Sequence, residues 1–287
     1  MEPPSDSRTG SNPTSTSKRR SADWKARNRD PRHARLMSRI ILVRHAQATF
    51  SADPAEAFEN YDQLSPLGLT QADALGEELV RSGVVFDRVF VGPARRHEQT
   101  ANAAAAAYSR SDRPWPDPST VEELQEHSGA SVVEIMLSTA QYADARRQIQ
   151  APGADSRTRA RAYFSAFREI TRSWARADLP SDPGSESGAL LDAVESWQAF
   201  RARVERGMRK ILDEVGGSGT IAVFTSGGPI GSTVARALGL ADEQAIELAW
   251  AVQNTTVTEF VFREDRLSLK SFNAQPRFSS VELVTYV

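Results

Sequence analysis

The chain has 287 residues, of which 40% are hydrophobic and 25% charged, with a formal net charge of -2. This composition is that of an ordinary globular protein, and it gives no reason to expect nucleic acid binding by the folded domain. The absence of cysteine excludes disulfides, thiolate nucleophiles and cysteine-based metal sites. No apolar run approaches the ~18 residues that span a bilayer and no secretory signal is recognisable, so we expect a cytoplasmic protein without membrane contact.

Residues 1–37 differ in composition from the rest of the chain. Pro, Ser, Thr and Asn dominate at first, and a series of lysines and arginines follows. Such a segment cannot bury enough apolar surface to offset its ordering entropy, so we expect a disordered basic tail that is solvated rather than bound to nucleic acid or lipid. Met37 directly precedes the first predicted strand and is an alternative natural start. Residues 38–287 are expected to form one α/β domain.

The first strand is predicted by four consecutive apolar residues that begin at Ile40, three of them β-branched. Such a run is typical of a buried parallel strand. Arg44 and His45 follow at its carboxyl end, where open α/β sheets place their ligands. An arginine offers a fork of donors that matches phosphate or carboxylate, and a histidine can act as nucleophile, base or acid near neutral pH. The alternative is an ordinary polar pair that closes a strand.

The next elements repeat the order of strand, turn and helix. A helix is expected over 65–82, because it starts with a serine cap followed by proline. A strand over 88–91 ends at a Gly-Pro turn, and an alanine-rich helix over 94–108 follows. Arg96 and His97 fall in the first turn of that helix. Cations are unfavourable there unless an anion offsets them, so this placement indicates an anion site, the alternative being a solvent-exposed basic turn.

The middle of the chain is predicted to be mostly helical. A short strand is expected over 121–124, and three helical blocks follow at about 131–150, 157–178 and 190–215, separated by breaks rich in Pro, Gly and Ser. We interpret residues 131–190 as a helical insertion that caps the strand ends. Its arginines can recognise a second anionic group of a substrate or form a solvated helical face. These arginines are Arg146, Arg147, Arg157, Arg159 and Arg161.

A further buried strand, over 220–224, runs into Ser226, Gly227 and another helix. Free amide groups on such a turn favour an anion, so Ser226 and Gly227 are candidate phosphate ligands, although Ser226 can also be a plain N-cap. The segments 255–263 and 267–273 predict a β-hairpin. Together the elements predict a three-layer α/β/α fold with a mostly parallel central sheet and a helical cap.

Five motifs, in this order, resemble those of a known family over roughly residues 38–273. They are Leu42-Val43-Arg44-His45-Ala46, Leu64 to Ala72, Gly92 to Ala101, Leu124-Gln125-Glu126, and Asn254 to Thr258. The family is the histidine phosphatase superfamily, in its phosphoglycerate mutase-like branch of small bacterial phosphatases. The segment from Gly92 to Ala101 is similar to the family's serine-proline-x-x-arginine and glutamine-threonine-alanine segment. The resemblance implies the phosphoglycerate mutase-like fold.

The resemblance also implies a role for each matched residue. His45 would attack phosphorus and become phosphorylated, while Arg44 and Arg96 would bind the phosphoryl oxygens. Glu126 would protonate the departing oxygen and then activate water, which calls for a carboxyl whose pKa is raised by its neighbours. Neither a metal nor a cofactor is required. The expected partner is a small phosphorylated substrate, and a homodimer is compatible with the sequence.

The sequence departs from the family pattern at two positions. Ala46 replaces a glycine, which is a mild change unless that residue needs a positive φ. Ser226 stands where the family has its second histidine, directly before Gly227. Loss of one such donor typically costs on the order of a hundred- to thousandfold in rate. His97, which we expect at the pocket rim, is the candidate surrogate imidazole, the alternative being a surface helix residue.

Three functions are compatible with these residues. The first is a phosphomonoester hydrolase that acts through a phosphohistidine on His45. The second is a catalytically weakened or inactive regulatory protein that binds phosphate esters, because Ser226 replaces the expected histidine. The third is a serine hydrolase that uses Ser226, but the glycine two residues before the serine, which a nucleophile elbow needs, is missing.

Overall fold

The computed structural model describes residues 38–49, 62–179, 185–216, 218–263, 266–278 and 281–285. The predicted basic tail, with the alternative start at Met37, lies outside the described residues. Within the described ranges, no helix is long and apolar enough to cross a membrane.

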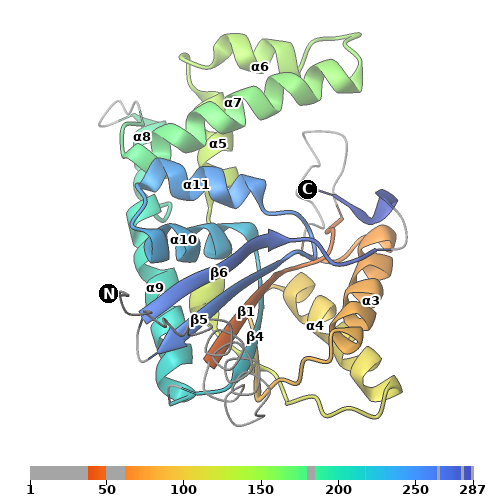
Figure 1. Ribbon diagram of the computed structural model, residues 1–287. Helices are drawn as coiled ribbons and strands as arrows, with labels where there is room; N and C mark the ends of the chain where they lie inside the picture. Colours follow the sequence, from red (N-terminus) through yellow and green to blue (C-terminus); the bar gives the residue numbers. More distant parts are fainter. Residues whose placement is uncertain are drawn as a thin grey trace, which may run out of the picture. The chain divides into compact units, whose positions relative to one another are not determined.

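A six-stranded sheet with the order β3-β2-β4-β1-β5-β6 forms the centre of the fold (Figure 1). The strands are β1 (Ser38–Arg44), β2 (Arg88–Val91), β3 (Ser119–Thr120), β4 (Thr220–Thr225), β5 (Val257–Arg263) and β6 (Arg266–Ala274). The first four pair in parallel, while β5 is antiparallel to β1 and to β6. Arg44 is opposite Thr225 in the register of β1 and β4. These two strands therefore finish together at one edge of the sheet.

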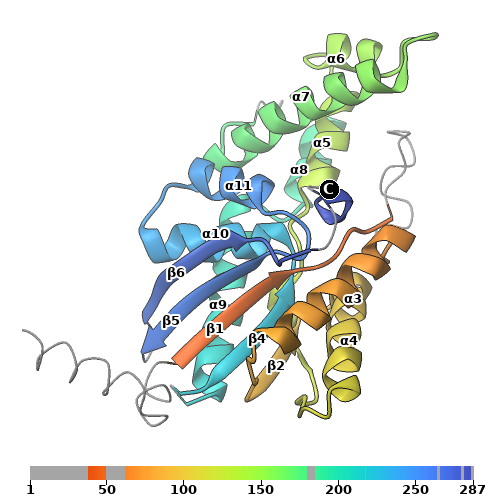
Figure 2. The ribbon, with the colours of Figure 1, turned by 45° about the vertical axis from the view of Figure 1, so that its right-hand side comes forward.

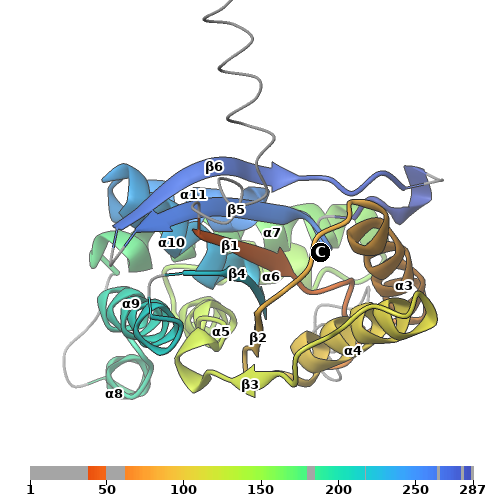
Figure 3. The same cartoon turned by 60° about the horizontal axis from the view of Figure 1, so that its bottom comes forward.

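Helices cover both faces of this sheet, as predicted (Figure 3). On one face lie α3 (Pro66–Arg81) and α4 (Arg95–Arg110), and on the other lie α9 (Trp197–Glu214) and α10 (Gly227–Leu238). The remaining helices are α5 (Gly129–Ser138), α6 (Ala143–Ile149), α7 (Ser156–Arg176), α8 (Glu186–Asp192) and α11 (Asp242–Ala251). In Figures 1 and 2, α5, α6 and α7 lie beyond the end of the sheet at which β1 and β4 finish. The architecture is the mixed α/β, three-layer fold that the sequence predicts.

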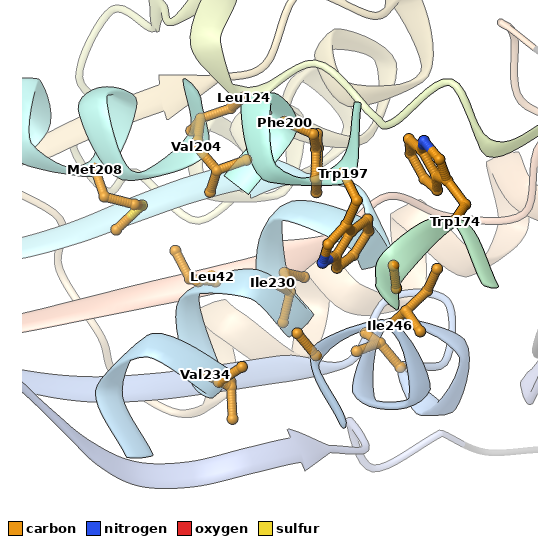
Figure 4. Close-up of a cluster of buried hydrophobic side chains, with 14 of the residues drawn as sticks. Leu42, Leu124, Trp174, Trp197, Phe200, Val204, Met208, Ile230, Val234 and Ile246 are labelled. Carbon is orange, nitrogen blue, oxygen red and sulfur yellow. The ribbon is translucent and has the colours of Figure 1, made fainter. Parts of the chain in front are cut away.

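Strand β1 is apolar throughout its middle because it packs against helices on both sides. Successive side chains of a strand point to opposite faces, so Ile40 and Leu42 enter one core and Ile41 and Val43 enter the other. Figure 4 shows Leu42 in the first of these cores, between Val204 and Met208 of α9 and Ile230 of α10. All four β1 side chains are buried. Two layers of core thus fix the strand that carries Arg44 and His45.

Two sequence predictions of secondary structure are wrong in detail. The segment 121–124 is not a strand: β3 comes earlier, over Ser119–Thr120, and Glu122–Leu124 form a 3₁₀ turn. Two adjacent glutamates favour this turn because acidic residues fit poorly in a strand. The predicted helical blocks 131–150 and 190–215 are each two helices. In the second block, the side chain of Ser196 accepts a hydrogen bond from the Ala199 amide and starts a new helix.

The first turn of α3 supports the loop that follows β1. Ser65 caps the helix as predicted, with its side chain accepting from the Gly68 amide at 3.0 Å. The Ser65 amide donates to the Gln47 carbonyl, and the Gln47 amide donates to the Gln71 side chain at 2.8 Å. A Cβ atom on Gly68 would collide with the Gln47 carbonyl, so only glycine permits this approach. Helix α3 therefore holds the chain in place two residues beyond His45.

Candidate active site

The structure brings the predicted site residues together where β1, β2 and β4 end. Arg44 and His45 follow β1, Arg96 and His97 lie in the first turn of α4 behind β2, Ser226 and Gly227 follow β4, and Glu126 follows the 3₁₀ turn. Arg96 is the central contact of the group. Its Nε lies 3.2 Å from His45 Nε2, its Nη2 lies 3.3 Å from Ser226 Oγ, and its Nη1 lies 3.2 Å from Asp62 Oδ1.

The hydrogen bonds of His45 determine which ring nitrogen carries the proton. Nδ1 lies 2.7 Å from the Ala46 carbonyl oxygen, which can only accept, so Nδ1 is the protonated nitrogen. Nε2 then keeps its lone pair and accepts from Arg96 Nε. The backbone beside the ring is fixed as well: Asn254 Nδ2 donates to the His45 carbonyl, and the Ala46 amide donates to Thr100 Oγ1. The nitrogen on the side of Arg96 is thus the unprotonated one.

The surroundings of His45 also keep its ring uncharged. Burial lowers the pKa of His45 well below its usual value, and the positive charges of Arg96 and Arg44 lower it further. Arg44 is itself buried and donates from Nη1 to the Val252 carbonyl. A neutral imidazole has the lone pair that an attack on phosphorus needs. The arginines that are expected to bind phosphate therefore also keep the histidine neutral.

His97 is fully buried, and both locations considered from the sequence are wrong: it is neither at the pocket rim nor on the surface. The first turn of α4 points the ring inward, and Nε2 lies 2.6 Å from Ser226 Oγ. Burial, reinforced by Arg96, lowers the pKa of His97 to about 3, so the ring is neutral at pH 7. His97 therefore stands behind Ser226, and reaches the site through the serine hydroxyl.

Gly92 makes the space that His97 occupies. A Cβ atom on Gly92 would lie 2.5 Å from His97 Nδ1, which is closer than real Cβ atoms approach. Ser226 is also smaller than a histidine. A glycine before the Pro93 turn, a histidine in the helix and a serine after β4 are thus one packing arrangement. The sequence connects His97 with Ser226 as a surrogate imidazole, but it does not indicate the part that Gly92 plays.

Glu126 differs from its predicted state. Its carboxylate accepts from the Gly228 amide at 3.2 Å and from the His127 amide at 2.9 Å. Burial would raise the pKa of Glu126, but the His127 ring, these two amides and Arg96 together outweigh it and lower the pKa. The predicted raised pKa is therefore wrong for the substrate-free site. A Cβ atom on Gly228 would collide with Glu126 Oε1, so any larger residue there would displace the carboxylate from its present position.

His127 is a site residue that the sequence analysis missed. Its Nε2 lies 3.8 Å from Glu126 Oε1, and its Nδ1 accepts from the Gly129 amide at 3.0 Å. The ring packs edge-on against Trp174, Trp197 and Phe200 with centroid distances of 5.6, 5.8 and 5.5 Å. The one cue in the sequence is its position next to Glu126. These aromatic rings come from α7 and α9, and a local pattern does not reveal them.

A cavity of about 850 Å³ opens above these residues. Arg44, Arg96, Glu126, Gly227 and Gly228 line it at the strand ends, while α7 and α11 provide the opposite wall. This volume is typical of a small-molecule site. We call the part lined by Arg44, Arg96, Gly227 and Gly228 the phosphate end of the cavity, because the sequence predicts phosphate binding by the first three of these residues.

The model of the histidine phosphatase superfamily (branch 1) matches residues 40–177 and 163–275. The chain belongs to the histidine phosphatase superfamily. The motifs that carry the sequence resemblance all lie within the matched residues. No protein of curated function matches the chain.

Solved structures of this superfamily's fold are similar along most of the chain. A phosphoglycerate mutase from Bacillus anthracis is 16% identical with a TM-score of 0.52, covering 83% of this chain and 93% of its own. A mycobacterial glucosyl-3-phosphoglycerate phosphatase is 19% identical with a TM-score of 0.52, covering 83% and 100%. A structure named mycobacterial hydrolase 2 is 20% identical with a TM-score of 0.53, covering 86% and 95%. At these identities the likeness establishes the fold.

The neutral state of the two buried histidines can be measured by nitrogen-15 NMR of the imidazole rings. Because both pKa values lie below the usual 6.5, we expect the ring signals of His45 and His97 to remain those of neutral tautomers from about pH 8 down to about pH 5. The variants His45→Ala and His97→Ala assign the signals, and the urea-unfolded protein supplies the reference titration. A midpoint near the reference value for either ring would contradict this account.

The packing of His97 against Gly92 can be tested by a double-mutant cycle. Gly92→Ala is expected to lower the free energy of unfolding by about 1–3 kcal/mol, because the methyl group meets the His97 ring. In a His97→Ala background, the same change meets the space left by the ring, so we expect a coupling energy of at least about 1 kcal/mol in urea unfolding. An equal cost of Gly92→Ala in both backgrounds would show that the two positions are independent.

Proposed function

We propose that this protein is a phosphomonoester hydrolase that forms a phosphohistidine on His45. The observation that carries the proposal is the hydrogen bond between His45 Nε2 and Arg96 Nε, because it sets an imidazole nitrogen directly behind an arginine that lines the phosphate end of the cavity. Membership of the histidine phosphatase superfamily supports it. The site residues come from separate segments of the chain, yet they supply a nucleophile, a cationic clamp and a carboxyl group in one place.

The first step transfers the phosphoryl group to the histidine. A phosphate monoester dianion binds to Arg44, Arg96 and the positive N-terminal end of α10 at Gly227. Arg96 Nε moves its hydrogen bond from His45 Nε2 to a phosphoryl oxygen, which frees the lone pair. A bond forms between Nε2 and phosphorus, and the phosphorus–oxygen bond of the ester breaks. The arginines stabilise the charge on the equatorial oxygens throughout.

Glu126 supplies the proton for the departing oxygen. Its pKa is lowered in the substrate-free site, but a phosphate dianion beside it raises that pKa, because like charges disfavour ionisation. The carboxyl group thus takes up a proton as the substrate binds and gives it to the leaving oxygen. As a carboxylate it then removes a proton from water, which attacks phosphorus. The bond to Nε2 breaks, and inorganic phosphate and neutral His45 are released.

In this mechanism Ser226 and His97 together replace one histidine. When Arg96 turns to the phosphate, Ser226 Oγ becomes a donor to a phosphoryl oxygen. In this step His97 is the Nε2-protonated tautomer and donates to Ser226 Oγ, 2.6 Å away, which leaves the single hydroxyl hydrogen for the phosphate. His97 is therefore a positioning residue. A serine nucleophile is disfavoured, because Phe224 stands two residues before Ser226, where a nucleophile elbow needs a glycine.

The second candidate is a phosphate-ester-binding protein with weak or no turnover. The replacement of an imidazole by the neutral hydroxyl of Ser226 favours it. Removal of one donor of transition-state charge typically costs on the order of a hundred- to thousandfold in rate. Both candidates use the same phosphate end of the cavity, so binding alone does not separate them.

Turnover of 4-nitrophenyl phosphate separates the two candidates. We expect hydrolysis by the unaltered protein and a loss of at least about a thousandfold in His45→Ala, because the nucleophile is gone. His97→Ala is expected to lower kcat more than it raises KM, since Ser226 then loses its support. Leu69→Ala, an exposed leucine on α3, is the control for surface substitution.

Each other result has a definite meaning. Inorganic phosphate binding, measured by calorimetry, without turnover by the unaltered protein would favour the binding protein over the hydrolase. Turnover that survives in folded His45→Ala would exclude His45 as the nucleophile. Unchanged kinetics in folded His97→Ala would remove His97 from the mechanism and leave His45 in it.

A further inference from the structure

The cavity continues well beyond its phosphate end, and this remainder is lined by aromatic side chains. Tyr163, Phe164 and Phe167 come from α7, and Trp250 comes from α11. Tyr163 and Phe164 are in contact, with ring centroids 5.7 Å apart. Phe164 is 40% exposed, although it is a large apolar side chain. An exposed aromatic residue at a cavity wall indicates a binding surface rather than a core position.

The charged side chains in this part of the cavity do not favour a second anion. Arg203 is fully engaged: it donates to both carboxylate oxygens of Glu195, at 2.8 and 2.7 Å, and to two backbone carbonyls. Arg168 lies over the Trp250 ring, 5.1 Å from its centroid. In the rest of the cavity, outside the phosphate end and Glu126, the described lining includes these two arginines and three glutamates. The glutamates are Glu122, Glu195 and Glu247.

The arginines that the sequence offered for a second anionic group lie elsewhere. Arg146 donates to the carbonyls of Leu137 and Thr139, and Arg147 pairs with Asp144. All five arginines, Arg146, Arg147, Arg157, Arg159 and Arg161, lie in the described ranges, and none of them lines the cavity. A substrate with a second phosphate or carboxylate on its leaving group would therefore meet aromatic rings, three carboxylates and two arginines, one of which already pairs with Glu195 while the other stacks on Trp250.

We infer that the leaving group of the substrate is an uncharged apolar body, a ring system or an alkyl chain, which packs against Phe164, Phe167 and Trp250. This inference rests on the proposed function of the same cavity. Burial of apolar surface gives the discrimination, because each additional buried methylene or ring edge strengthens binding at no electrostatic cost. Phe164 and Trp250 are then residues that determine specificity, while Arg44 and Arg96 bind the phosphate common to all substrates.

Binding of phosphonates, which the enzyme cannot hydrolyse, tests the inference whether or not turnover occurs. We expect hexylphosphonate and 1-naphthylmethylphosphonate to bind to the full chain at least about tenfold more tightly than ethylphosphonate, as measured by calorimetry. We expect 2-carboxyethylphosphonate to bind no better than ethylphosphonate. In Phe164→Ala or Trp250→Ala, the ratio of hexyl to ethyl affinity should fall at least about threefold, and in Leu69→Ala it should stay unchanged.

The two apolar probes also distinguish a ring from a chain. Tighter binding of 1-naphthylmethylphosphonate indicates a ring system as the leaving group, and tighter binding of hexylphosphonate indicates an alkyl chain. Equal affinity for the hexyl, naphthylmethyl and ethyl compounds, or a preference for the carboxyethyl compound, would overturn the inference. If the ratio of hexyl to ethyl affinity is unchanged in both Phe164→Ala and Trp250→Ala, and both variants are folded, the role of α7 and α11 is overturned. If the protein does not hydrolyse 4-nitrophenyl phosphate but still binds the apolar phosphonates more tightly, the hydrolase proposal fails and the inference about the apolar leaving group stands.

Discussion

The hydrogen bond between Arg96 Nε and the unprotonated Nε2 of His45 is the interaction on which the site depends. One buried guanidinium contacts the histidine, the Ser226 hydroxyl and the Asp62 carboxylate, and so it fixes the positions of three groups from different segments. Its charge also favours the neutral form of both buried rings, His45 and His97. The same cation that orients His45 thus keeps its ring neutral, and in the mechanism that we propose it passes to a phosphoryl oxygen when substrate binds.

The fold makes this contact available by ending three parallel strands at one edge. The register that sets Arg44 opposite Thr225 brings His45 to the start of α10. Because β2 pairs with β4, helix α4, which follows β2, begins beside His45 and Ser226. Glycines stand where these segments approach most closely. Gly68 admits the loop behind His45, Gly228 admits the Glu126 carboxylate, and Gly92 admits the His97 ring. Core packing on both faces of β1 holds the edge rigid, and the cavity itself extends outward to α7 and α11, where substrates of different shape can be distinguished.

The sequence predicts those features that depend on local pattern. The apolar run before Arg44 and the repeated order of strand, turn and helix are sufficient to predict the sheet and to bring Arg44, His45 and Arg96 to one edge of it. The pKa of Glu126 was predicted in the wrong direction, because its sign depends on amides and a His127 ring that local sequence does not position. The orientation of His97 was also missed. A residue in a helical first turn can face solvent or the core, and the choice depends on space left by side chains distant in sequence.

The central claim is that His45 carries the phosphoryl group during turnover. Rapid quenching of the reaction with 4-nitrophenyl phosphate, followed by peptide mass spectrometry under alkaline conditions that preserve phosphohistidine, tests it most directly. The account predicts an acid-labile phosphate on the peptide that contains His45, which appears before steady state and is absent from His45→Ala. An acid-stable phosphate on Ser226, or steady turnover with no phosphate on His45, would contradict it.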